Sequence, residues 1–285
     1  MTLENQSTCM NLFAYNVDLH KMKCKSWPKH WYFIKYSKLH LRKKLPCISD
    51  IIDQVSSRKE FVNRLFSNRE IRKIEKRTIG QSDNIDWFYY RKGVVTATCV
   101  KRIVNAKKRK NINYESINKA IEKRYSPKLY YPALIYGCEN ESKGLEAFYH
   151  QMKHCHRNLK IQRVGLKLDE SMQYLGGSGD GMVLCDCCPE PSLIEIKCPH
   201  RLRNSSVEEN GHILNYLDEN FNLIKSHQYY YQINVCLGVW GYEKCYFVVY
   251  TPNDILIREV YFDAELYSTI KNCVNNYYFN HFLKL

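Results

Sequence analysis

The chain has 285 residues, enough for one large domain with a full hydrophobic core, or for such a domain with a small appendage. Its 43 Lys and Arg residues outnumber its 29 Asp and Glu residues, and the formal net charge of +14 favours a polyanionic partner. No apolar stretch is long enough to span a membrane and the Met1 region has no apolar signal core, so we expect nucleic acid and no membrane.

The 13 cysteines point to a reducing compartment, because their number is odd and no secretory signal accompanies them. We expect an intracellular protein of the nucleus or cytoplasm of a host cell, not a secreted one. The densest group, Cys185, Cys187 and Cys188, lies in a predicted turn, with Cys198 just beyond it. Zinc and iron–sulfur sites usually show two separated CxxC pairs, which this chain lacks, so ordinary thiols are favoured here over a metal site.

Residues 1–78 form a basic and mostly irregular region in which no function is readable. Apolar spacing between Asp50 and Phe66 predicts one or two short helices, and Asn68 to Arg77 is a charged helix or linker. A shift in composition near Thr78 marks the predicted boundary with a second domain, residues 79–285.

An anion site is predicted near the start of the second domain. A short aromatic helix over Asn84 to Tyr90 runs into Arg91, and helical spacing resumes after Thr98. Thr96 or Thr98 then stands at a helix N-terminus, where a hydroxyl, free N–H groups and the positive dipole end attract anions. Arg91 could add a bidentate contact. The alternative is a plain threonine cap beside a surface arginine.

The next helix carries a carboxylate on an apolar face. After a predicted loop that begins at Tyr130 to Pro132, residues at helical spacing share one stripe: Glu141, Leu145, Phe148 and Met152. Glutamate is rarely buried without a partner, which a metal ion or a lysine would supply. The alternative is a favourable interaction with the helix dipole.

A hairpin of charged and apolar residues follows the glycine-rich segment 176–181. Asp180 to Cys185 reads as a strand, and Asp186 to Ser192 reads as a turn. In the second strand, period-two alternation puts Glu195 and Lys197 on one face, near Asp180. Two carboxylates would bind Mg²⁺ or Mn²⁺, and Lys197 could position or deprotonate a water that attacks a phosphodiester. The alternative is an edge strand whose charges are merely solvated.

The last third of the chain predicts a helix, a hairpin and a second helix. A polar segment from His200 to Leu223 precedes the helix Ser226 to Leu237, which has Gln228, Gln232 and Val235 on one face. A second hairpin spans Cys245 to Phe262, and an aromatic helix begins at Ala264.

Five segments occur together in one order: Arg91–Thr98, Gly137–Glu141, Ser178–Gly181, Glu195–Pro199 and Tyr229–Gln232. In this combination the chain resembles the lambda exonuclease and YqaJ-type viral recombinase nucleases of the PD-(D/E)xK superfamily, over about residues 79–262. The resemblance implies an α/β (α+β) fold with a central mixed sheet flanked by helices, to which residues 1–78 add a mostly helical extension.

The resemblance also implies roles for individual residues. Glu141, Asp180, Glu195 and the backbone carbonyl of Ile196 would bind metal, as two Mg²⁺ or Mn²⁺ ions. Lys197 would assist the nucleophilic water, and Gln232 would support that water or the second ion. The residues that would hold the 5′-phosphate of the digested strand are Arg91, Thr98 and Ser178.

The implied activity is a Mg²⁺-dependent 5′-to-3′ exonuclease on linear double-stranded DNA, in recombination, replication or repair. A single-strand annealing protein as partner and a ring-shaped homo-oligomer follow from the resemblance alone. Two other functions stay open, namely a structure-specific endonuclease on the same fold and a non-catalytic DNA-binding protein. The chain departs from the family pattern at four positions: Thr98 for serine, Gly144 for alanine, Gly179 for proline and Asn234 for glutamine.

Overall fold

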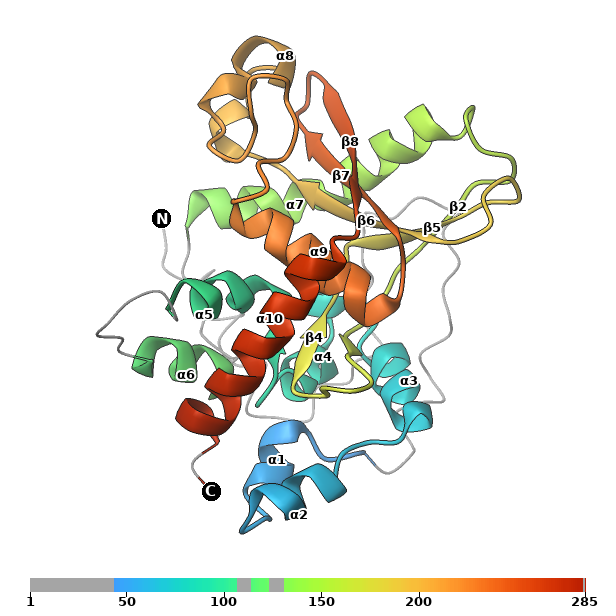
Figure 1. Cartoon of the computed structure of the whole chain (residues 1–285). Coiled ribbons are helices and arrows are strands. Elements are labelled where there is room, and N and C mark those ends of the chain that lie inside the picture. Colours follow the sequence, from blue (N-terminus) through green and yellow to red (C-terminus); the bar gives the residue numbers. More distant parts are fainter. Residues whose placement is uncertain (1–43, 107–113, 123–130, 284) are drawn as a thin grey trace, which may run out of the picture. The chain divides into compact units, whose positions relative to one another are not determined.

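The larger of two sheets carries the hairpin that the sequence marks as a site (Figure 1). Its strands, in spatial order, are β2 (Lys160–Gln162), β5 (Gly181–Leu184), β6 (Ser192–Lys197), β7 (Lys244–Tyr250) and β8 (Ile255–Tyr261). β6 and β7 run parallel, whereas the other neighbouring pairs are antiparallel. The predicted mixed sheet is therefore confirmed, and so are the hairpins β5–β6 and β7–β8.

The computed structural model describes residues 44–106, 114–122, 131–283 and 285, which all lie in the unit that spans residues 32–285. Residues 1–43 of the predicted N-terminal region lie outside the described residues. In the part that the structure describes, no helix combines the length and the apolar character needed to cross a membrane.

Helices cover both faces of β6, the middle strand of the larger sheet. α7 (Pro132–Met152) lies on one side of the sheet and α9 (Gln228–Trp240) on the other (Figure 1). A Cβ atom added to Gly144 of α7 would lie 2.9 Å from Ile196 Cγ2, so α7 packs on the apolar face of β6. Gln232 of α9 donates to Glu195, the neighbouring residue on the opposite face. The strand thus turns its isoleucines toward α7 and its charges toward α9.

α7 begins earlier than the sequence predicts. The predicted loop is wrong at Pro132, which is the first residue of the helix, where a missing N–H costs no hydrogen bond, whereas Tyr130 lies outside the described residues. Leu145 and Phe148 are fully buried, as the predicted apolar stripe requires. Gly144 lets the helix approach β6 closely, which gives a packing reason for glycine where the family has alanine.

Short elements make up the rest of the described chain. The other helices are α1 (Ile48–Ile52), α2 (Arg58–Asn63), α3 (Asn68–Arg77), α4 (Ile85–Tyr90), α5 (Val100–Ala106), α6 (Glu115–Glu122), α8 (Val207–Asn210) and α10 (Ala264–Tyr277). The smaller sheet has the order β1 (Val95–Thr96), β4 (Leu175–Gly177), β3 (Lys167–Leu168). The expected long helix at the C-terminus is α10, which continues as a π-helix over Tyr278–Phe282.

The first helices share a hydrophobic core with the end of the chain. Phe61 of α2 is fully buried, and its ring centroid lies 6.3 Å from that of Tyr174 and 6.1 Å from that of Tyr278. Tyr174 and Tyr278 stack on each other with centroids 4.2 Å apart. The division of the chain at residue 78 stays a prediction.

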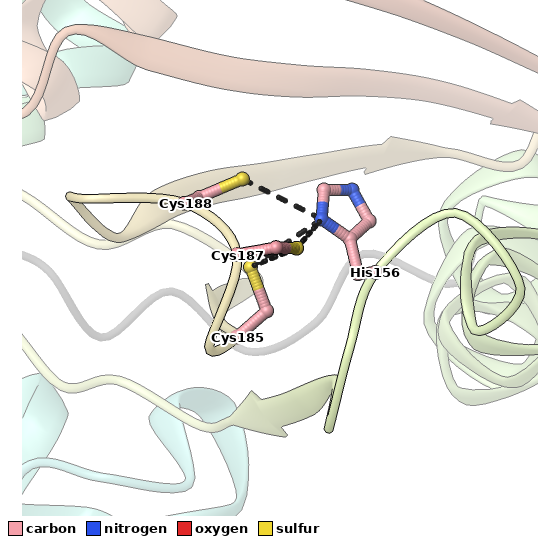
Figure 2. Close-up of side chains that lie close together, drawn as sticks. All are labelled: His156, Cys185, Cys187 and Cys188. Atoms are coloured by element: carbon pink, nitrogen blue, oxygen red, sulfur yellow. Dashed lines mark hydrogen bonds between the residues drawn. The ribbon is translucent and has the colours of Figure 1, made fainter.

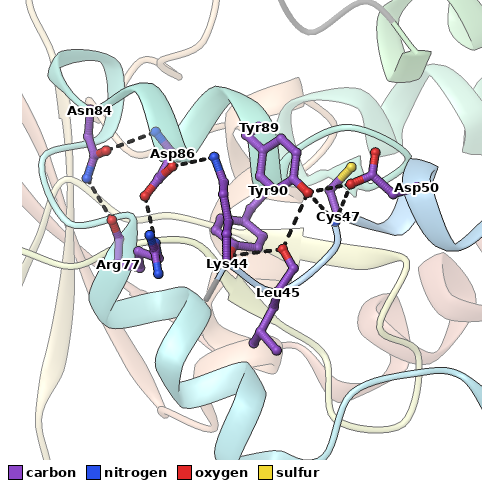
Figure 3. Close-up of polar contacts among 9 residues, drawn as sticks. All are labelled: Lys44, Leu45, Cys47, Asp50, Arg77, Asn84, Asp86, Tyr89 and Tyr90. Atoms are coloured by element: carbon purple, nitrogen blue, oxygen red, sulfur yellow. Dashed lines mark hydrogen bonds and ion pairs between the residues drawn. The ribbon is translucent and has the colours of Figure 1, made fainter. Parts of the chain in front are cut away.

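A buried carboxylate fixes α4, the aromatic helix that precedes Arg91. Asp86 is 3% exposed and forms ion pairs with Lys44 (2.6 Å) and with Arg77 at the end of α3 (2.7 Å) (Figure 3). Asn84 caps the same helix by accepting from the Asp86 N–H, and it donates to the Arg77 carbonyl (Figure 3). A buried charge with two cationic partners holds α4 in one orientation against α3.

Candidate active site

Asp180 meets the carboxyl end of β6 at the open end of the β5–β6 hairpin. The Asp180 N–H donates to the Ile194 carbonyl (2.9 Å), and the Ile196 N–H donates to Asp180 Oδ2 (2.6 Å). Because β5 begins only at Gly181, the side chain of Asp180 takes the place of a backbone partner for Ile196. Its position is therefore set by the sheet itself.

Glu195 is a buried carboxylate with two side-chain donors. It is 2% exposed, and its Oε1 accepts hydrogen bonds from Lys197 Nζ and from Gln232 Nε2, the latter at 2.5 Å. Lys197 shares the face of β6 as period-two alternation predicts, and Gln232 reaches across from α9. The structure thus brings together three predicted site residues that lie up to 37 positions apart in sequence.

Lys197 remains an ammonium cation in this arrangement. Burial of the side chain works against the charge, but the carboxylates of Glu195 and Asp180 outweigh it and raise the pKa of Lys197 above its ordinary value. The Nζ atom also lies 4.4 Å from the centroid of the Tyr229 ring, which adds a cation–π contact. A firmly protonated lysine suits positioning and charge compensation better than proton abstraction.

Glu141 of α7 interacts electrostatically with Glu195 and Lys197. Burial raises the pKa of Glu141, the nearby charge of Arg163 opposes this shift, and the charge of Glu195 adds to it. Burial, followed by the charges of Glu195 and Glu141, raises the pKa of Asp180 well above its ordinary value. The three carboxylates therefore interact electrostatically. We call the following set of five residues the acidic cluster: Glu141, Asp180, Glu195, Lys197 and Gln232.

The acidic cluster has the donor atoms that divalent cations prefer. Three carboxylates provide hard oxygen ligands of the kind that Mg²⁺ and Mn²⁺ prefer. Burial first, and then the charge of neighbouring carboxylates, raises the pKa values of Glu141 and Asp180. A bound cation would relieve that repulsion and favour the ionised carboxylates.

Arg91 directly follows α4, Thr98 lies in a 3₁₀ turn (Ala97–Cys99) after β1, and Ser178 directly follows β4. A tryptophan connects two of these predicted phosphate residues. Arg91 places its guanidinium carbon 3.7 Å from the centroid of the Trp87 ring, and Trp87 Nε1 donates to Ser178 Oγ (3.3 Å). β1 and β4 pair in parallel with Thr96 opposite Gly176, so Thr98 and Ser178 each follow two residues further along. Thr98 is exposed, and its Oγ1 lies 3.2 Å from Thr96 Oγ1.

The sequence alone does not identify three residues that contact or act on the predicted site residues. Trp87 stands in the predicted aromatic helix, yet nothing in its spacing shows that it bridges Arg91 and Ser178. Arg163 lies between β2 and β3 and acts on Glu141. Gln81 adopts a positive φ of 48° and donates from Nε2 to the Gly179 carbonyl (2.6 Å), just before β5 begins.

Comparison with known proteins gives one family and several solved structures. The model of the YqaJ-like viral recombinase domain matches residues 86–243, a range that includes all five motif segments. The chain is similar to LHK-Exo, an alkaline exonuclease from Laribacter hongkongensis solved in complex with dAMP, at 20% identity and a TM-score of 0.51. That match covers 67% of this chain and 89% of the other. No curated protein sequence matches the chain.

Two further solved structures are from a herpesvirus protein. A SOX–DNA complex has 11% identity, covers 82% of this chain and 78% of the other, and gives a TM-score of 0.49. The shutoff and exonuclease protein of Kaposi's sarcoma-associated herpesvirus has 12% identity, covers 82% and 79%, and gives a TM-score of 0.47. The predicted resemblance and the predicted α/β fold of PD-(D/E)xK type are confirmed by the family model and by the likeness to LHK-Exo.

Proposed function

Because the chain belongs to the YqaJ-like viral recombinase domain family, we propose that it is a metal-dependent exonuclease that digests linear double-stranded DNA from 5′ ends. The family and the fold support a nuclease that acts on DNA. Metal dependence, polarity and the duplex substrate are what the proposal adds. The observation that supports it is the contact of Glu195 with Lys197 and Gln232, beside Asp180, at the carboxyl end of β6.

The acidic cluster would hold two Mg²⁺ or Mn²⁺ ions through Glu141, Asp180, Glu195 and the backbone carbonyl of Ile196. Such ions, when bound, polarise a phosphodiester and lower the pKa of a water molecule. Lys197 carries a positive charge at the same place, where it can orient the water and offset charge on the phosphate. Gln232 holds the Glu195 carboxylate through Oε1 and so limits its rotation.

Arg91, Thr98 and Ser178 would hold the 5′-phosphate. The guanidinium of Arg91 offers a bidentate contact to phosphate oxygens, and the two hydroxyls add neutral donors. Trp87 supports this set, because its ring lies against Arg91 and its N–H binds Ser178 Oγ. A phosphate pocket next to the acidic cluster would restrict cleavage to chain ends.

The basic surface would bind the DNA backbone without selecting sequence, since the net charge is +14. A ring-shaped homo-oligomer and a single-strand annealing partner in recombination, replication or repair belong to the same proposal. We place the activity in a reducing compartment, the nucleus or cytoplasm of a host cell. All cysteines among the described residues are free, which supports this assignment.

The decisive experiment compares three DNA substrates in Mg²⁺: a 5′-phosphorylated linear duplex, its 5′-hydroxyl counterpart and a covalently closed circle. We expect nucleotides to be released from the phosphorylated duplex, more slowly from the hydroxyl form and not from the circle. No release is expected when divalent ion is omitted. A cut circle would assign an endonuclease instead, and DNA binding without turnover in Mg²⁺ or Mn²⁺ would assign a non-catalytic binder.

A further inference from the structure

Four metal-ligating atoms converge at the turn of the β5–β6 hairpin, away from the acidic cluster. His156 and three cysteines of the turn, Cys185, Cys187 and Cys188, place one ligand atom each so that all four lie within 4.8 Å of one another (Figure 2). We call these four residues the cysteine cluster. They come from two separate segments, because His156 follows α7 and the cysteines join β5 to β6.

The distances within the cysteine cluster do not describe ordinary hydrogen bonds. The sulfur of Cys185 lies 3.3 Å from His156 Nδ1, and those of Cys187 and Cys188 each lie 3.5 Å from the same atom (Figure 2). A neutral imidazole nitrogen either donates one hydrogen bond or accepts through one lone pair, so it cannot bind three thiols separately. The four atoms instead surround a common point.

That arrangement has the dimensions of a tetrahedral zinc site. Zn–S bonds of about 2.3 Å and Zn–N bonds of about 2.0 Å imply S···N separations of about 3.5 Å and S···S separations of about 3.8 Å. The observed S···N distances are 3.3 to 3.5 Å, and the Cys187 and Cys185 sulfurs are 3.5 Å apart. A disulfide would need about 2.05 Å between sulfurs, far less than this spacing.

We propose that His156, Cys185, Cys187 and Cys188 bind one structural Zn²⁺ ion. Three thiolates and an imidazole match the preference of zinc for sulfur and nitrogen, whereas Mg²⁺ and Ca²⁺ prefer oxygen. Binding converts three thiols to thiolates and releases three protons, so the loaded site carries a net charge of −1. Four protein ligands close the coordination shell, which makes the ion structural and leaves no position for a reacting water.

Groups around the cysteine cluster orient its ligands. The Tyr246 hydroxyl on β7 lies 3.3 Å from His156 Nε2, so Nδ1 is left for the metal. The Arg157 N–H points at Cys187 Sγ (3.4 Å), a contact that favours a thiolate. The two segments are also tied by the Asp186 N–H, which donates to the Arg157 carbonyl (2.9 Å), and by Asn158 Nδ2, which donates to Asp186 Oδ2 (2.6 Å).

The zinc ion would join the end of α7 to the turn of the hairpin. α7 carries Glu141, and the hairpin carries Asp180 and Glu195, so the ion would brace against each other the two elements that build the acidic cluster. This role concerns stability and does not depend on the proposed nuclease activity.

The test measures metal in the untagged, full-length chain purified without chelator. Elemental analysis should find about one zinc ion per chain, as a closed four-ligand site requires. Cys188→Ser and His156→Ala should each lower zinc content at least about fivefold, since a ligand is lost. Cys155→Ser is the matched control, because Cys155 is an exposed cysteine next to His156 but outside the cluster, and it should keep full zinc content.

A second measurement does not depend on whether the variants fold. The wild-type chain, loaded with Co²⁺ in place of zinc, should show the sulfur-to-cobalt charge-transfer absorption and the intense visible bands of a tetrahedral thiolate site. Added Zn²⁺ should abolish both signals. A chain that contains no zinc and gives no such spectrum with Co²⁺ overturns the proposal, as does iron in place of zinc or a Cys155→Ser variant that loses metal.

Discussion

The two ends of the β5–β6 hairpin gather ligands of opposite chemistry. At the open end the acidic cluster offers hard oxygen atoms, and at the turn the cysteine cluster offers soft sulfur atoms and one nitrogen. The strand between them spans Gly181–Leu184, roughly 13 Å of extended chain. α7 serves both ends, because Glu141 lies within it and His156 follows its last residue by four positions.

The clusters differ in how closely their ligand atoms already match the geometry of a bound cation. In the cysteine cluster the ligand atoms already stand at the separations of a tetrahedral site. In the acidic cluster, Lys197 and Gln232 both donate to the same oxygen of Glu195, Oε1. A cation that binds this oxygen must displace these donors or share the oxygen with them. A structural ion needs a preformed shell, whereas ions that take part in a reaction need ligands that can rearrange.

The largest expected effect is a loss of cleavage in variants of the acidic cluster. Lys197→Ala and Asp180→Ala should each lower the cleavage of linear duplex at least about 10³-fold, because the first removes a positive charge beside the reacting phosphate and the second removes a proposed metal ligand. Zinc content should not change. The rate of nucleotide release and elemental analysis of the same samples check both statements.

The control for the lysine is Lys244→Ala on β7, which removes a lysine of the same sheet whose partners are Glu259 (2.8 Å) and the Tyr246 hydroxyl (3.0 Å). It should cleave at nearly the wild-type rate. Equal losses in Lys197→Ala and Lys244→Ala would mean that the lysines act only through the general basic charge.

The next largest effect is a loss of stability in variants of the cysteine cluster. His156→Ala should destabilise the fold by about 2 to 4 kcal/mol, since a zinc-bound cross-link between α7 and the hairpin is lost. For a chain of this size the melting temperature should fall by about 5 to 15 °C. Thermal unfolding monitored by circular dichroism measures the shift. Cleavage well below the new melting temperature should stay within about threefold of wild type, and abolished cleavage there would show that the two ends are not independent.

A smaller effect concerns the choice of DNA end. Trp87→Ala removes the ring beneath Arg91 and the donor to Ser178, so preference for a 5′-phosphate over a 5′-hydroxyl should fall about tenfold, or about 1.4 kcal/mol. Trp87→Phe keeps a ring for Arg91 but loses the N–H. Its preference for a 5′-phosphate should lie between those of the wild type and Trp87→Ala. Ratios of kcat/KM on the two substrates provide the measurement, and an unchanged ratio would remove Trp87 from the phosphate site.

The smallest effect is a pH dependence of stability. The pKa values of Glu141 and Asp180 are raised by burial and by neighbouring carboxylates, so the folded chain binds their protons more tightly than the unfolded chain. This contribution to stability is complete below the unfolded values of about 4 and is lost as pH rises through the folded pKa values.

In urea unfolding without Mg²⁺, the wild type should therefore lose stability relative to Asp180→Asn as pH rises. Asparagine keeps an oxygen that accepts from the Ile196 N–H but removes the charge. Added Mg²⁺ should flatten the wild-type profile. A difference between the wild type and Asp180→Asn that does not change with pH would contradict this prediction.

The sequence predicts the fold well where apolar residues repeat with the period of a strand or of a helix. Alternation over β6 places Glu195 and Lys197 on one face, and the stripe on α7 places Leu145 and Phe148 in the core. The order of five short segments predicts the family, because each segment is short but their combination is rare. Pro132 shows the limit of such signals, since a proline opens a helix as readily as it ends one.

The sequence predicts the sites less completely, because convergence in space leaves no local mark. His156 lies 29 positions before Cys185, so the turn cysteines show one CxxC spacing without their fourth ligand and the sequence favours plain thiols. Trp87 reaches Ser178 across 91 positions for the same reason. Ile196 is read as a carbonyl ligand, whereas its N–H also matters because it holds Asp180.

The parallel pairing of β6 with β7 sets when the acidic cluster can assemble during synthesis. Glu195 lies opposite Phe247, and neither strand finds this partner until the ribosome has released the chain well past residue 250. Contacts so distant along the chain form late, after local helices and hairpins. A polypeptide that stops before β7 would lack the strand that pairs with the far edge of β6, so the sheet that carries the acidic cluster would be incomplete.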